Sequence, residues 1–174
     1  VQRKGIALKV GLIILSLLLL ASCSEKTMTD SRFVLGTVCT ITINGSDDEA
    51  LMSSAFDLLY EIDRSISRFD ENSWVYKINK NAGKEAVAVP EDIFALIKAT
   101  LEMAERTEGV FNPAIGPLSS LWGFGTESAR VPEKSEIEAV LPLVDYRLVT
   151  LSEEDSSVFL EKEGMALDLG AVGK

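Results

Sequence analysis

Apolar residues recur at intervals of three and four in two long stretches of the chain, a spacing that predicts amphipathic helices. In the first, residues 47–66, the apolar positions are Leu51, Ala55, Leu58, Leu59, Ile62 and Ile66. Ser46 and Glu49 stand there at the spacing of a capping box. The second helix begins at Pro90 and ends at Gly109, with Ile93, Leu96, Ile97, Leu101 and Ala104 as its apolar stripe. A third, shorter helix is predicted from Pro132 to Leu141.

Runs rich in β-branched and alternating residues predict strands. They cover residues 32–44 (with Gly36-Thr37 inside), 86–89, 148–151, 158–161 and 165–168. Residues 67–73 are polar apart from Phe69, and residues 110–126 form an apolar loop rich in glycine and proline. Because hairpin-like strand pairs and helices follow no regular βαβ order, we expect an α+β fold: a mixed, largely antiparallel sheet with packed helices.

The start of the chain has the layout of an export signal. Three basic residues precede the uncharged run 10–22, which is shorter than the roughly 20 apolar residues of a membrane-spanning helix. The run ends in Leu20-Ala21-Ser22-Cys23, which resembles the lipobox of bacterial lipoproteins. We therefore predict a removable signal over residues 1–22, a lipid on Cys23, and a polar tether over residues 23–31. The alternative is a signal peptide that ends near a cysteine by coincidence.

Charge and residue usage exclude several classes of function. The net charge is −10 at pH 7, and residues 1–22 hold three of the basic residues and no acidic one, so the remainder is still more acidic. Such a chain repels phosphates, so we expect no nucleic-acid partner and a membrane link through acyl chains alone. The chain has no histidine, which excludes Ser–His or Cys–His catalysis and a His-ligated zinc site within these residues. Cys39 is expected to be a buried, inert thiol.

Two segments have compositions suited to binding a ligand. In residues 166–174, an expected strand ends at Asp168 and is followed by Gly170, Gly173 and Lys174, a combination suited to phosphate. A P-loop is excluded, because the glycine it requires six positions before the lysine is replaced by Asp168. Residues 109–125 combine glycines, prolines and aromatic residues, as a site for a planar ring does. Both segments also have a purely structural interpretation, as a strand-to-helix turn and as a packed core loop.

Taken in order, four segments resemble the ApbE family, the FAD:protein FMN transferases once described as thiamine-biosynthesis lipoproteins. They are residues 35–37, residues 63–69, residues 109–118 with 121–125, and residues 167–174. The resemblance assigns residues 32–174 to the N-terminal part of an ApbE-like flavin transferase domain.

The resemblance implies magnesium-dependent transfer of FMN from FAD to a threonine of acceptor proteins in the extracytoplasmic space. The implied acceptors are subunits of Rnf-type and sodium-pumping quinone reductase-type complexes. The implied flavin-binding residues are Leu35, Phe69, Val110, Phe111, Asn112, Asp168 and Lys174, and the main-chain carbonyl of Ala171 is implied to contact Mg2+. Leu35 stands where the family often has methionine, and Asn112 where it often has aspartate.

The resemblance also implies that the other metal ligands lie downstream of Lys174, so we expect these residues alone to be catalytically inactive. The alternative function is an FAD-hydrolysing or flavin-binding lipoprotein that transfers nothing to protein. We expect a protein exported and lipid-anchored to a bacterial cell membrane, facing the periplasm or the cell exterior.

Overall fold

A computed structural model describes residues 26–172. Its strands and helices are, in order, β1 (Thr27–Val34), β2 (Thr37–Asn44), α2 (Glu49–Ile66), α3 (Trp74–Lys80), β3 (Val87–Ala88), α4 (Glu91–Arg106), α5 (Gly116–Trp122), α6 (Lys134–Val140), β4 (Val149–Ser152) and β5 (Ser157–Leu160). Short 3-10 helices occupy Pro113–Ile115, Leu141–Leu143 and Tyr146–Leu148. The strands form two antiparallel sheets, β1-β2 and β3-β5-β4. The predicted α+β class, with helices packed on largely antiparallel strands, is confirmed.

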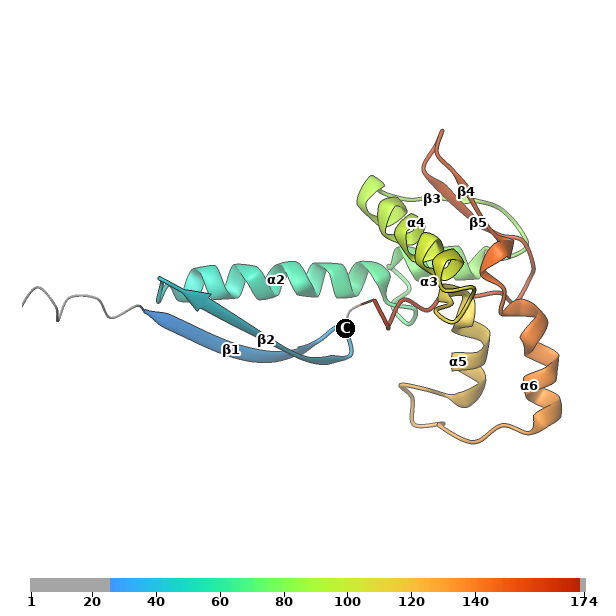
Figure 1. Cartoon of the computed structure of the whole chain (residues 1–174), viewed down its shortest axis with the longest axis horizontal. Helices are drawn as coiled ribbons and strands as arrows, with labels where there is room; N and C mark the ends of the chain where they lie inside the picture. The colour runs from blue at the N-terminus through green and yellow to red at the C-terminus, as the bar shows by residue number, and fades with distance from the viewer. Residues whose placement is uncertain (1–25, 173–174) are drawn as a thin grey trace, which may run out of the picture.

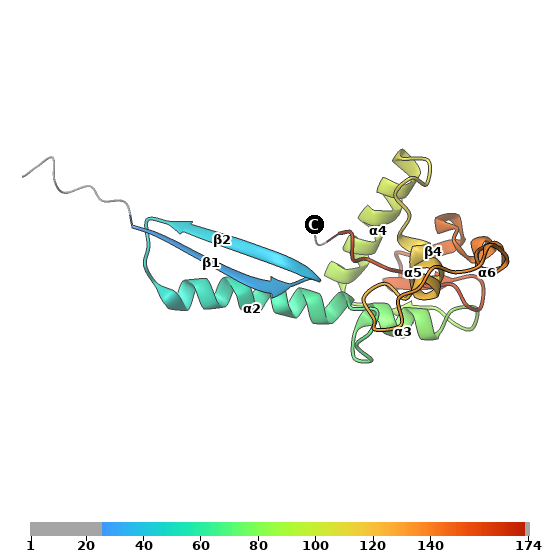
Figure 2. The ribbon, with the colours of Figure 1, turned by 90° about the horizontal axis from the view of Figure 1, so that it is seen from below.

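The β1–β2 hairpin lies along α2, and together they form an elongated arm that projects from a body made of the other elements (Figures 1 and 2). The chain reverses at Leu35-Gly36, whose φ angles of 55° and 68° are those of a two-residue hairpin turn. The single strand predicted over residues 32–44 is therefore wrong, because Gly36 lies in the turn between two strands.

Strand β1 begins at Thr27, inside the segment predicted to be a tether. The hydroxyl-bearing residues of that segment pair across the hairpin: the Thr29 and Thr42 hydroxyl oxygens lie 3.0 Å apart. Sequence reasoning took these residues for solvated linker because they are polar, although threonine also favours strands. Cys39 of β2 is half-buried rather than buried, and its thiol donates to the Val34 carbonyl at 3.6 Å.

Helix α2 occurs where it was predicted, but it buries a different face. Met52 and Phe56, which lie outside the predicted stripe, are buried, whereas Leu51, Leu58 and Ile62 of that stripe are exposed. Ile66, the last residue of the predicted stripe, is buried as expected. The hairpin covers Met52 and Phe56, and the guanidinium of Arg32 lies 4.4 Å from the centre of the Phe56 ring. Ile66 packs in the core of the body instead. The N-cap is Asp48, which accepts from the Ala50 N–H, so the predicted Ser46–Glu49 capping box is wrong.

The body contains the main hydrophobic core, to which α3, α4, β5 and the extended residues 165–169 contribute. The hairpin β4–β5 and the long helix α4 are confirmed, although Pro90 is the N-cap of α4 rather than its first residue. Helix α3 was missed. It is only 7 residues long, and Ser73 caps it by accepting from the Tyr76 N–H at 2.9 Å.

Two further expectations for the body are wrong. The segment predicted as a loop over residues 110–126 contains α5, because Pro113 and Pro117 lie in first turns, where a proline needs no N–H partner. Residues 165–168 are not a strand. Their backbone groups bond to a side chain and to the α5 region rather than to a neighbouring strand, as described below.

The start of α6 supplies a pH-dependent contact. The pKa of the Glu136 carboxyl is lowered from 4.5 to about 2. The largest cause is its hydrogen bond from the Arg130 guanidinium, and the second is its hydrogen bond from the Glu133 N–H. Since the folded pKa is depressed, the contribution of this contact to stability is complete above about pH 4.5 and is lost as the pH falls toward 2.

We expect the Glu136 carboxyl to titrate near pH 2 in the folded protein, as measured by NMR. In Arg130→Gln the pKa should rise toward 4.5, because the largest cause of the shift is removed. Arg147→Gln is the control, since Arg147 pairs with Asp145 instead. A Glu136 pKa that is the same in Arg130→Gln as in the unchanged protein would contradict this assignment.

Candidate functional site

A cavity of about 760 Å³ lies where the arm meets the body, a size within the range of cofactor and small-molecule sites. Its walls come from segments far apart in the sequence: Leu35-Gly36, Arg68-Phe69, residues 109–112, Phe124-Gly125, Asp168, Gly170 and Ala171, together with residues of α5 and the Leu141–Val144 turn. A smaller cavity of about 170 Å³ shares Leu35, Phe69 and Asp168 with it.

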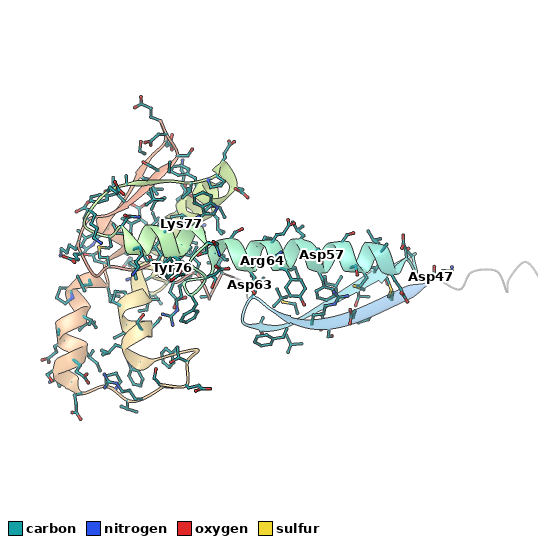
Figure 3. All side chains as sticks on the ribbon, turned by 180° about the vertical axis from the view of Figure 1, so that it is seen from behind. Asp47, Asp57, Asp63, Arg64, Tyr76 and Lys77 are labelled. Carbon is teal, nitrogen blue, oxygen red and sulfur yellow. The ribbon has the colours of Figure 1, made fainter. Side chains whose placement is uncertain are left out.

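The tip of the hairpin is held against the end of α2. The Leu35 N–H donates to Oδ2 of Asp63 at 3.1 Å, and Figure 3 shows Asp63 where the arm joins the body. This bond fixes a turn in which Leu35, a non-glycine residue, has a positive φ. The Leu35 side chain packs against the main core. This cavity wall is therefore held both by the backbone bond to Asp63 and by the packing of the side chain.

Arg68 connects three parts of the cavity, and sequence reasoning missed it. Its Nε lies 3.3 Å from Oδ2 of Asp168, and its other nitrogens donate to Oγ of Ser120 at 3.0 Å and to the Phe124 carbonyl at 2.8 Å. Its guanidinium carbon also lies 4.3 Å from the centre of the Phe69 ring. The only signal in the sequence was a cation directly before an aromatic residue, which says nothing about partners so distant in the chain.

Asp168 sits on an extended segment that is held without a β-ladder. The Asn79 carboxamide bonds to the Leu167 backbone on both sides, accepting from its N–H at 2.7 Å and donating to its carbonyl at 3.0 Å. The Asp168 N–H donates to the Pro113 carbonyl at 2.8 Å, and the Gly116 N–H donates to the Ala166 carbonyl at 3.1 Å. These bonds explain why the predicted strand is absent and why the Asp168 side chain reaches the cavity.

Residues 110–112 form another wall of the cavity. Val110 is 91% exposed, and the Phe111 N–H donates to Oγ1 of Thr107 at 3.1 Å. Asn112 caps the following 3-10 helix: its Oδ1 accepts from the Ala114 N–H at 2.9 Å, and its Nδ2 donates to the Val144 carbonyl at 3.3 Å. An aspartate could make the first of these bonds but not the second, because an ionised carboxylate has no donor.

Two aromatic rings stand at the edge of the cavity, and both are 58% exposed. Phe69 does not fold back onto the core. Phe124 stacks on Trp122, with 5.7 Å between the ring centres and 11° between the planes. The segment around Phe124 is thus partly packed and partly open, and its open part can meet a planar ligand.

The structure brings together nearly all the residues that were predicted to bind flavin or metal. Leu35, Phe69, Val110, Phe111, Asn112, Asp168 and Ala171 all line the cavity, and their contacts with flavin or metal stay predictions. Lys174 and Cys23, like the predicted signal over residues 1–22, lie outside the described residues. Between residues 26 and 172, no helix is long and apolar enough to cross a membrane.

The described residues do not complete a magnesium site. Residues 26–172 contain no group of three or more His, Cys, Asp or Glu side chains placed to hold a metal ion. Asp168, the carboxylate that lines the cavity, accepts from the Gly170 N–H and pairs with Arg68. A magnesium ion held here would take its remaining ligands from water, substrate phosphates or residues outside this range.

Comparison with known proteins identifies the family, since residues 35–174 match the ApbE family. The chain belongs to the ApbE family. An FAD:protein FMN transferase of Klebsiella pneumoniae is 39% identical over 129 residues, which cover 74% of this chain and 41% of that protein. One of Treponema pallidum is 29% identical over 179 residues, covering 95% of this chain and 49% of that protein. The chain thus spans about half the length of these curated relatives or less.

Solved structures of the ApbE family have the same fold. The ApbE protein of Thermotoga maritima is 32% identical and superposes with a TM-score of 0.79, over 85% of this chain and 48% of that one. The flavin transferase ApbE of Vibrio cholerae superposes with a TM-score of 0.78 over 87% of this chain and 50% of that one. At 23% identity, this second likeness concerns the fold alone.

Proposed function

We propose that this protein transfers FMN from FAD to a threonine of acceptor proteins. One observation carries the proposal: a single cavity gathers seven residues that the ApbE resemblance assigns to flavin or metal, from segments spread over the whole described chain. The relatives named as FAD:protein FMN transferases support the same reaction.

The walls of the cavity suit a flavin ring. The exposed rings of Phe69 and Phe124 offer flat apolar faces. The N–H groups of residues 109–111 already donate to Ala104 and Thr107, so this segment offers its backbone carbonyls to the polar edge of the ring. In the transfer, the threonine oxygen would form a bond to the FMN phosphorus of FAD. The bond from that phosphorus to the AMP oxygen would break, AMP would leave, and the hydroxyl proton would pass to a base or to water.

The charges in the cavity support a requirement for a further cation. Among the described residues that line it, Arg68 and Asp168 are the charged ones, and they pair with each other. These walls thus carry no net positive charge to offset the pyrophosphate of FAD. We propose that magnesium and Lys174 supply it, with the Ala171 carbonyl as one metal ligand; a bound magnesium ion stabilises negative charge on phosphate oxygens and on the leaving group.

The site of action is proposed from the sequence alone. A signal over residues 1–22 and a lipid on Cys23 would hold the protein on a membrane, facing the periplasm or the cell exterior. Subunits of Rnf-type and sodium-pumping quinone reductase-type complexes are the proposed acceptors.

The test incubates the protein, at its natural length, with FAD, magnesium and an acceptor domain that carries the target threonine. We expect mass spectrometry to show the acceptor gaining the mass of one FMN, with one AMP released for each transfer. An acceptor with valine in place of that threonine is the matched control and should gain nothing. Release of both FMN and AMP into solution would instead identify an FAD hydrolase. If the flavin binds but no FAD is consumed, the protein is a flavin carrier.

A further inference from the structure

We propose that Arg68 is the positioning residue that assembles the flavin cavity by holding the Phe69 ring, the Asp168 carboxylate and the Phe124 loop in one arrangement. The nature of the ligand rests on the proposed function, whereas the positioning role rests on the contacts of Arg68 within the chain. Neither the ApbE resemblance nor the comparisons assign a role to this residue.

The first support is the set of partners that one side chain joins. Ser120 lies 52 residues after Arg68, and Phe124 lies 56 residues after it. Asp168 belongs to a third segment, next to the end of the described chain. A guanidinium group can serve all of them at once because its donors point in fixed, coplanar directions.

The second support is burial. The Arg68 side chain is 13% exposed and that of Asp168 is 20% exposed, so water replaces the contacts between them poorly. Removing the cation would leave a half-buried carboxylate without its counter-charge and the Phe124 carbonyl without its donor. The face of the Phe69 ring would lose the cation that lies over it. All three walls should then become mobile together.

The third support separates positioning from direct binding. Arg68 donates hydrogen bonds to two protein acceptors, on Ser120 and Phe124, and Asp168 balances its charge. A residue that positions the ring-binding walls affects every ligand that contains the flavin ring. A residue that binds phosphate affects only the phosphorylated flavins.

The experiment compares Arg68→Met with Arg32→Met. Arg32 is a matched control, because its guanidinium also lies over a phenylalanine ring and its Nε pairs with an aspartate, but it lines no wall of the cavity. Riboflavin, FMN and FAD are titrated into each protein and followed by flavin fluorescence. In Arg68→Met we expect all three dissociation constants to rise by about tenfold. In Arg32→Met they should stay unchanged.

Either of two results in this titration would overturn the proposal: unchanged constants for all three flavins, or a loss confined to FMN and FAD. A second measurement needs no ligand. The Gly170 N–H donates to Oδ1 of Asp168, so its hydrogen exchange should become at least about tenfold faster in Arg68→Met and stay unchanged in Arg32→Met. If the unchanged protein binds no flavin, the proposed function fails, and this exchange rate alone decides the role of Arg68: an unaltered rate refutes it.

Discussion

Replacing Gly116 with alanine is expected to destabilise the protein by about 3 kcal/mol. A Cβ atom at this position would lie 2.5 Å from the Ala166 carbonyl oxygen and 2.7 Å from the Ala166 Cβ. Neither atom belongs to a flexible side chain that can turn away. The same approach allows the Gly116 N–H to bond to the Ala166 carbonyl, so the substitution also pushes away the segment that carries Asp168.

Chemical denaturation of Gly116→Ala would measure this loss, with Gly45→Ala as the matched control. A Cβ at Gly45 meets nothing within 4 Å, so that variant carries only the strain of a positive φ, about 1 kcal/mol. If Gly116→Ala loses no more stability than Gly45→Ala, the close approach of the two backbones is not important for the fold.

Removing the Asn79 side chain is expected to cost about 3 kcal/mol, because Asn79→Ala leaves the N–H and the carbonyl of Leu167 without their partners in the core. The Leu167 side chain is fully buried, so water reaches these backbone groups poorly. Flavin affinity should fall as well, since Asp168, which lines the cavity, directly follows Leu167 in the chain.

Two variants sharpen the Asn79 prediction. In Asn81→Ala, the lost side chain bonds only to the Lys77 carbonyl within the same helix end, so a loss of about 1 kcal/mol or less is expected. Asn79→Asp keeps the acceptor for the Leu167 N–H but points a second carboxylate oxygen at the Leu167 carbonyl, so it should be no more stable than Asn79→Ala. Near-normal stability of Asn79→Asp, measured by thermal unfolding, would show that the pair of bonds is not what holds this segment.

The local spacing of apolar residues predicted correctly those elements that bury a regular apolar stripe of their own. Helix α4 and the hairpin β4–β5 were predicted close to their observed bounds, since their spacing and turn residues are carried within the element. The prediction of α2 was right for its extent and wrong for most of its buried face, since only Ile66 of the predicted stripe is buried. That helix has apolar residues on two faces, and only the packing of the β1–β2 hairpin decides that Met52 and Phe56 are covered.

The sequence by itself pointed to seven of the residues that line the cavity, because the ApbE motifs are local strings that can be recognised in order. Only the tertiary structure decided how those walls are held together. Arg68 and Asn79 act on partners 52 to 100 residues away, and no local spacing encodes such contacts. For the same reason residues 165–168 look like a strand and are not one. The alternation of apolar and other residues in this segment reflects the burial of Met165 and Leu167. A strand also needs hydrogen bonds to a neighbouring backbone, and here the Asn79 carboxamide makes the bonds to the Leu167 backbone instead.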